Sequence, residues 1–169
     1  MQIYLMQHGH ALSEEQDTQR HLSPEGKAQI GRTAAALKEM GISFDLIISS
    51  PKARARESAE IVADTLSYPI NENEITDTLT PNSSPEDFIN FLMEFKDRES
   101  VFIAGHLPSL YNIALHLLCE SCSINIKFEM GGVLRIDAER LPTRQGVLRY
   151  YLLPEQLNII AGRQRLEHE

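Results

Sequence analysis

Residues 2–10 have the sequence Gln-Ile-Tyr-Leu-Met-Gln-His-Gly-His, a short apolar run that ends in a polar, glycine-containing turn. The run over 2–6 is rich in residue types that favour strands, and it predicts a β-strand. The same order recurs at 45–51 (Asp-Leu-Ile-Ile-Ser-Ser-Pro) and at 100–108 (Ser-Val-Phe-Ile-Ala-Gly-His-Leu-Pro), which predicts strands over 45–48 and 100–104. Strands that alternate with helices indicate βαβ units and a mostly parallel sheet.

Helix starts separate these runs. Residues 23–25 and 84–86 both read Ser-Pro-Glu, an N-cap residue followed by Pro at the first helical position, and 49–51 and 108–109 open two more helices. The late apolar runs 133–137 and 147–153 predict two further strands, which can form an antiparallel edge. The expected fold is α/β, a three-layer sandwich with a mostly parallel central sheet and helices on both faces.

The length and net charge of the chain limit the classes of function that it can have. The 169 residues fit one domain, expected at 1–162, followed by a polar tail at 163–169. A net charge of −8 disfavours a broad nucleic-acid-binding face. No run approaches the ~20 apolar residues of a membrane span, and the N-terminus does not resemble a secretory signal. We therefore expect a cytoplasmic monomer that binds neither nucleic acid nor membranes.

Polar side chains gather at three strand-to-helix junctions, Gln7-His8-Gly9-His10, Ser50-Pro51-Lys52-Ala53-Arg54 and Gly105-His106-Leu107-Pro108. Because the carboxyl ends of parallel strands converge, we expect two histidines and at least one arginine in one cleft. The helix N-termini beside them favour an anion. A neutral imidazole with one nitrogen held by a backbone acceptor can attack phosphorus with its other nitrogen. The junctions therefore predict a phosphate site.

These motifs resemble those of the histidine phosphatase superfamily and, within it, the short SixA-type phosphohistidine phosphatases. The family's Arg-His-Gly motif corresponds to Gln7-His8-Gly9, its Ser-Pro-x-x-Arg-Ala motif to residues 50–55, and its Gly/Ser-His-Leu-Pro motif to 105–108. The SixA-type Arg-Pro-Leu-Thr corresponds to Arg20-His21-Leu22-Ser23, and Leu79-Thr80-Pro81 is also similar. The resemblance covers residues 1 to about 120 and implies a phosphoglycerate mutase-like fold.

The resemblance implies a role for each matched residue. His8 would be the nucleophile that is transiently phosphorylated, and Arg54 and His106 would be catalytic with it. The phosphate-binding set would be Gln7, Gly9, Arg20, Arg54 and His106. No metal and no cofactor are implied. The partner would be a phosphorylated substrate. A phosphohistidine-bearing protein domain is favoured for two reasons. Imidazole is a good leaving group, and the short segment 68–98 leaves no room for a large lid over the site.

Gln7 departs from the family pattern, which has arginine there. A glutamine amide replaces a charge-assisted hydrogen bond with an ordinary one, a difference of about 1–2 kcal/mol or roughly 10- to 30-fold in rate. We therefore expect a weakened or retuned phosphatase. A non-catalytic phosphate or phosphoprotein-binding module is the first alternative, with Gln7 marking lost turnover.

A metal-dependent hydrolase is the second alternative. It would use His8, His10, His21 and His106, although further ligands at defined spacing do not follow them. Asp77, Glu86 and Asp87 are the carboxylates available as a general acid, without a matching motif. Arg56 and His116 are expected on the surface, and Cys119 and Cys122 are expected to be free structural thiols.

Overall fold

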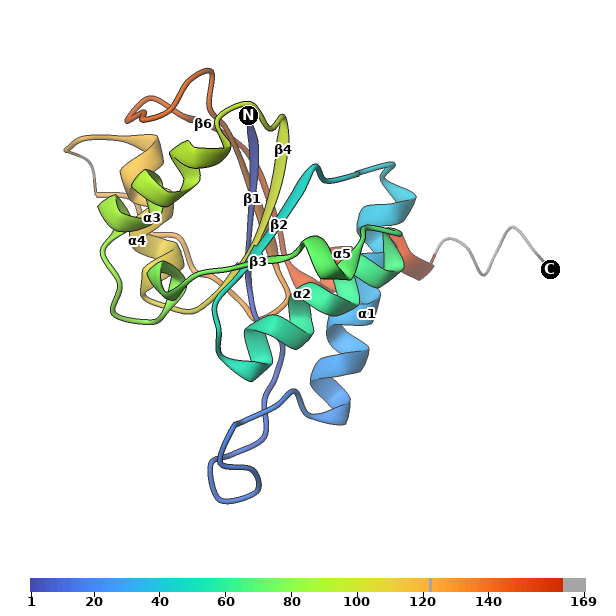
Figure 1. Cartoon of the computed structure of the whole chain (residues 1–169). Coiled ribbons are helices and arrows are strands. Elements are labelled where there is room, and N and C mark those ends of the chain that lie inside the picture. Colours follow the sequence, from blue (N-terminus) through green and yellow to red (C-terminus); the bar gives the residue numbers. More distant parts are fainter. Residues whose placement is uncertain (122, 163–169) are drawn as a thin grey trace.

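The computed structural model describes residues 1–121 and 123–162, and its centre is a six-stranded sheet with helices on both sides (Figure 1). The strands are β1 (Gln2–Gln7), β2 (Leu46–Ser49), β3 (Glu74–Ile75), β4 (Ser100–Gly105), β5 (Val133–Asp137) and β6 (Val147–Leu152). Their spatial order is β3-β2-β4-β1-β5-β6. The first four strands pair in parallel, whereas β5 is antiparallel to β1 and β6 is antiparallel to β5. The predicted sheet, with its antiparallel edge, is confirmed.

Five α-helices in the described chain cover the sheet: α1 (Pro24–Glu39), α2 (Ala53–Thr65), α3 (Pro85–Leu92), α4 (Ser109–Leu118) and α5 (Pro154–Gly162). Short 3-10 helices span Ile70–Glu72, Asp77–Leu79 and Met93–Phe95. Successive side chains of a strand point to opposite faces. Accordingly, Ile3 and Leu5 of β1 pack with α3 and α4, while Tyr4 and Met6 pack with α1, α2 and α5. The three-layer sandwich is therefore confirmed.

Local sequence signals explain where most helices start. Ser23 caps α1 by accepting a hydrogen bond from the Gly26 N–H at 3.0 Å, and Ser84 caps α3 by accepting one from the Glu86 N–H at 3.2 Å. The second helix starts later than the Ser-Pro motif predicts, at Ala53. Ser50 continues the line of β2 instead, since its N–H donates to the Ala104 carbonyl at 3.1 Å.

Other expectations were wrong. His116 lies buried, 8% exposed, because α3 packs against α4 and brings the Glu86 carboxylate to 3.2 Å from its ring. Cys119 is disulfide-bonded, so it is not a free thiol, and Cys122 and the predicted tail at 163–169 lie outside the described residues. The two-residue strand β3 and helix α5 were not predicted. No helix in the described part of the chain has the length and apolar character needed to cross a membrane.

Candidate active site

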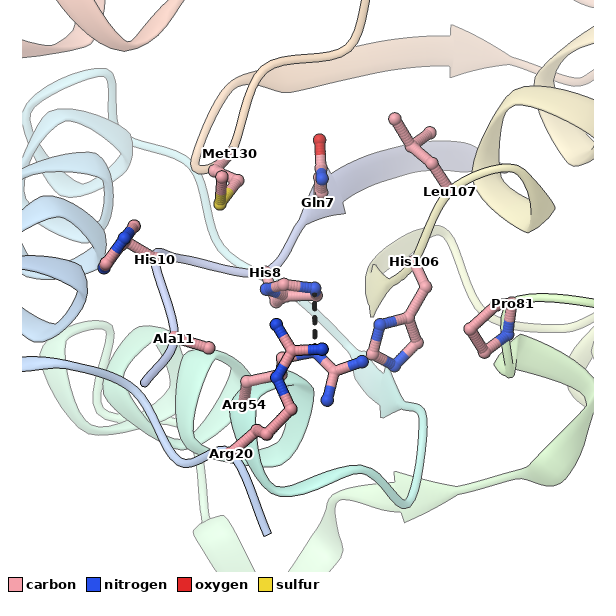
Figure 2. A pocket seen from close by; sticks show the side chains of 10 residues that line it. All are labelled: Gln7, His8, His10, Ala11, Arg20, Arg54, Pro81, His106, Leu107 and Met130. Carbon is pink, nitrogen blue, oxygen red and sulfur yellow. Dashed lines mark hydrogen bonds between the residues drawn. The ribbon is translucent and has the colours of Figure 1, made fainter. Parts of the chain in front are cut away.

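A pocket of about 340 Å³ lies where the chain leaves β1 and β4 and enters α2 (Figure 2). The strands β1, β4 and β2 are parallel neighbours, so their carboxyl ends bring three separate junctions to one edge of the sheet. The residues that line the pocket are Gln7, His8, His10, Ala11, Arg20, Arg54, Pro81, His106, Leu107 and Met130. Five of the six predicted phosphate-site residues therefore lie together.

Gly9 is the exception, since it does not line the pocket. Its N–H donates to the Ser58 hydroxyl at 3.1 Å, and Ser58 in turn donates to the Arg54 carbonyl at 2.7 Å. A Cβ at Gly9 would come within 2.8 Å of Ile30 Cγ1. The glycine therefore serves close packing of the turn that carries His8, which differs from the phosphate contact implied by the resemblance.

His8 is held with one ring nitrogen facing Arg54. Its Nδ1 lies 2.7 Å from the Gly9 carbonyl, which can only accept, so Nδ1 carries the proton and Nε2 keeps its lone pair. The Arg54 Nε–H donates to that Nε2 at 3.1 Å. Burial, together with the charges of Arg54 and Arg20, lowers the pKa of His8 to about 4. His8 is therefore neutral at physiological pH, which is the form that acts as a nucleophile.

His106 faces His8, with the two ring centroids 4.9 Å apart. Its Nε2 lies 3.0 Å from the Ser50 hydroxyl, while its buried Nδ1 has no hydrogen-bond partner among the described residues. Burial and, after it, the neighbouring His8 and basic side chains lower the pKa of His106 to about 3. His106 thus offers a neutral ring whose buried Nδ1 has no hydrogen-bond partner among the described residues.

The positive charge of the pocket comes from two arginines that Figure 2 draws beside each other below His8. Burial and the charge of Arg20 both lower the pKa of Arg54, as expected for two cations held close together. No carboxylate is found among the ten lining residues to balance them. A dianion such as a phosphoryl group would complement this arrangement.

Gln7 lines the pocket on a different side of His8 from the two arginines (Figure 2). Its carbonyl accepts from the Gly131 N–H at 2.9 Å, which fixes the end of β1 and brings Met130 to the pocket. Ser50, Ser58 and Met130 were not predicted as site residues. Ser50 stands in a recognised motif, but nothing in the sequence near Met130 signals its place, because that place depends on the pairing of β1 with β5.

The remaining candidates lie apart from the pocket or make other contacts. Asp77, Glu86 and Asp87 do not line it. The His10 Nδ1 is 2.8 Å from the Ser23 hydroxyl, and the His21 Nδ1 is 2.6 Å from the Asp17 carboxylate. Arg56 is exposed, as expected. Within residues 1–121 and 123–162, no three His, Cys, Asp or Glu side chains cluster as metal ligands would, so the geometry gives the metal-dependent alternative no support.

Three kinds of comparison show what the chain is similar to. Residues 3–76 match the model of the histidine phosphatase superfamily (branch 1). An uncharacterized protein of Picosynechococcus sp. is 27% identical over 148 residues, which cover 83% of this chain and 88% of that protein. The mitochondrial serine/threonine-protein phosphatase Pgam5 of Drosophila ananassae is 37% identical over 67 residues, 39% of this chain but only 23% of the length of Pgam5.

Among solved structures, the protein histidine phosphatase SixA complexed with tungstate superposes with a TM-score of 0.78 at 24% identity. The match covers 93% of this chain and 99% of SixA. The SixA-like α/β fold is therefore established for nearly the whole chain.

Proposed function

Because residues 3–76 carry the features of the histidine phosphatase superfamily and the chain has the SixA fold, we propose that it is a metal-independent phosphatase. It acts through a phosphohistidine intermediate on His8, and its substrate is phosphohistidine carried by a protein. The observation that carries the proposal is the Nε2 lone pair of His8, directed by the Gly9 carbonyl and placed beside Arg54 in a pocket without lining carboxylates.

In the first step, the Arg54 Nε–H leaves His8 Nε2 and donates to a phosphoryl oxygen instead, Nε2 attacks phosphorus, and the bond between phosphorus and the leaving group breaks. The Nδ1 proton stays in place and donates to the Gly9 carbonyl, so the charge of the phosphorylated ring is partly stabilised there. Arg54 and Arg20 bind the equatorial phosphoryl oxygens, and His106 lines the same pocket.

In the second step, water attacks the phosphoryl group on His8. The nitrogen–phosphorus bond breaks, His8 leaves as a neutral imidazole with its Nδ1 proton, and the proton of the water passes to the released phosphate. Both steps need only the lone pair of Nε2 and the fixed positive charges, and neither needs a metal ion.

The site favours phosphohistidine over an ordinary phosphoester. An alkoxide leaving group needs a proton donor, whereas a phosphohistidine ring protonated on its second nitrogen leaves as neutral imidazole. No carboxylic acid lines the pocket to protonate an alkoxide. The relatives do not decide the matter, since Pgam5 is named a serine/threonine-protein phosphatase and SixA a protein histidine phosphatase.

The decisive experiment is a search for the intermediate. After brief exposure to a ³²P-phosphohistidine protein and rapid quenching, the wild type should carry an acid-labile label, His8→Asn should carry none, and His10→Ala should keep it. Turnover should be unchanged in the presence of a metal chelator. Turnover that is unaffected by His8→Asn would refute the nucleophile, and loss of turnover with chelator would favour a metal-dependent hydrolase.

A non-catalytic phosphoprotein-binding module is the second candidate, and the neutral side chain of Gln7 in the pocket favours it. Tight binding of the phosphorylated protein with no label on His8 and no turnover would support that candidate. A monomeric state and a cytoplasmic location, without nucleic-acid or membrane partners, remain predictions.

A further inference from the structure

The loop between β1 and α1 holds Arg20 in an unusual backbone conformation. The bridge between Ala11 and Leu22 closes the loop, and the Leu12 N–H donates to the His21 carbonyl at 2.9 Å. Directly before His21, Arg20 has a φ of +53°, in the left-handed region that residues with a side chain rarely adopt. Such a conformation persists only where neighbouring contacts hold it.

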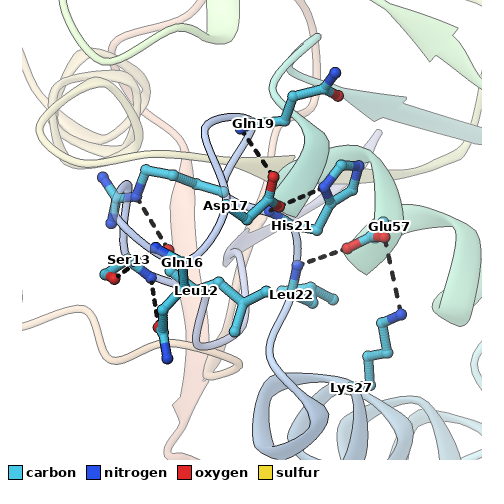
Figure 3. Close-up of polar contacts among 10 residues, drawn as sticks. Leu12, Ser13, Gln16, Asp17, Gln19, His21, Leu22, Lys27 and Glu57 are labelled. Carbon is cyan, nitrogen blue, oxygen red and sulfur yellow. Dashed lines mark hydrogen bonds and ion pairs between the residues drawn. The ribbon is translucent and has the colours of Figure 1, made fainter.

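Asp17 provides those contacts (Figure 3). Its carboxylate accepts from the Gln19 N–H at 3.1 Å and from the His21 N–H at 2.8 Å, and its carbonyl accepts from the Arg20 N–H at 2.9 Å. The His21 ring adds a contact at 2.6 Å from the same carboxylate. Asp17 therefore binds three consecutive amides with Arg20 in the middle. Hydrogen bonds from His21 are the main cause that lowers the pKa of Asp17, so the carboxylate is ionised at neutral pH.

Glu57 holds the far end of the same loop. One of its carboxylate oxygens accepts from the Leu22 N–H at 2.6 Å, and the other lies 4.0 Å from the Lys27 ammonium (Figure 3). Glu57 lies one turn after Arg54 on α2. The helix that presents Arg54 directly to the pocket therefore also anchors the loop that presents Arg20.

We propose that Asp17 and Glu57 are positioning residues, which fix the Arg20 guanidinium beside that of Arg54 so that both bind one phosphoryl group. This inference rests on the proposed function. Arg20 is suited to the role, because its Nε–H donates to the Leu12 carbonyl at 3.3 Å and it has no ion pair with any described carboxylate. Its terminal N–H groups are thus left for a ligand.

Phosphate binding should change in opposite directions on substitution of Asp17, depending on whether Asp17 positions Arg20 or acts only through its charge. Asp17→Asn removes a negative charge close to an anion site, and on charge alone it should strengthen phosphate binding. An amide has only one acceptor oxygen, so it cannot replace both contacts that the carboxylate makes with the amides of Gln19 and His21. If Asp17 acts through Arg20, the same change should weaken binding.

The test measures inorganic phosphate binding by calorimetry and the turnover of p-nitrophenyl phosphate. Asp17→Asn should weaken phosphate binding about 3- to 10-fold and raise KM similarly, with kcat nearly unchanged, because uniform binding is lost. Glu15→Gln is the matched control, since it removes one charge from the same loop and the Glu15 side chain is exposed. It should leave phosphate binding within twofold. Glu57→Gln should act in the same direction as Asp17→Asn.

A double-mutant cycle completes the test. In an Arg20→Ala background, Asp17→Asn should change phosphate binding by less than twofold, because the residue it positions is gone. Phosphate binding by Asp17→Asn that equals or exceeds the wild type would overturn the inference, as would an undiminished effect in the Arg20→Ala background. If the wild-type protein bound phosphate but had no turnover, the proposed function would be refuted. The comparison of phosphate binding between Asp17→Asn and the wild type would still test the positioning role of Asp17.

Discussion

Acidification should destabilise this protein through His106, which is only 2% exposed. Burial lowers the pKa of the folded-state imidazole to about 3, against 6.5 as the ordinary value. As the pH falls through 6.5, the unfolded chain takes up a proton that the folded chain does not. Stability is therefore fully present above pH 6.5 and is lost progressively between pH 6.5 and about 3.

The loss of unfolding free energy at pH 5 depends little on the pKa of His106 in the folded state. At that pH the unfolded imidazole is almost fully protonated and the folded one is neutral, so the loss is RT ln(1 + 10^1.5), about 2 kcal/mol. Typical domains have only about 5–15 kcal/mol of net stability, so such a loss is measurable. It also matters for function, since a neutral His106 is part of the proposed resting site.

The assay is urea denaturation at pH 8 and at pH 5 for the wild type and His106→Gln. Glutamine has an amide that can contact the Ser50 hydroxyl but cannot titrate. The fall in unfolding free energy between the two pH values should be about 2 kcal/mol smaller in the variant. Ser58→Ala, which removes a buried hydroxyl without a titrating group, should shift stability equally at both pH values. Equal losses in the wild type and His106→Gln would refute the reasoning.

Three further variants test the site and its support. Gln7→Arg should raise kcat/KM about 10-fold by adding a charge-assisted donor, and steady-state kinetics that show no gain would exclude a phosphate contact at this position. Arg54→Ala should lower kcat/KM about 100- to 1,000-fold, whereas the exposed Arg56→Ala should stay within twofold; similar losses would contradict the assignment. Gly26→Ala should lower the urea midpoint, although alanine favours helices, because its Cβ would overlap the His10 carbonyl oxygen; a higher midpoint would contradict the packing.

The sequence predicts the site well where local rules suffice. His8 and His106 follow strands that are parallel neighbours, and the convergence of parallel strand ends places them together without knowledge of any contact. Arg54 follows for the same reason, because it comes soon after β2. Arg20 lies late in the long connection that follows β1, so the convergence of strand ends does not place it, and only the family resemblance indicated its role.

Features that depend on packing between distant elements were not predictable. The His116 ring is buried because α3 covers it, and the periodicity of α4 alone does not reveal which helix lies above it. Met130 reaches the pocket through the register of β5 on β1, which no turn or propensity rule fixes. The hydrogen bonds of Asp17 with the amides of residues 19–21 are a third case, because a single aspartate in a polar loop is typical of many turns.

The chemistry of the leaving group sets the sharpest limit on the substrate. His106 has a pKa of about 3 in the free protein, so it could donate a proton at pH 7 only if bound substrate raised that pKa by about 4 units, roughly 5 kcal/mol. A phosphoserine would need such a donor, and a protonated phosphohistidine would not. Two peptides of one sequence that carry either group at the same position should therefore differ in kcat by about 100-fold or more in favour of phosphohistidine. Equal kcat values would mean that the pocket acquires an acid that the free structure does not reveal, and the preference for phosphohistidine would then have no physical basis.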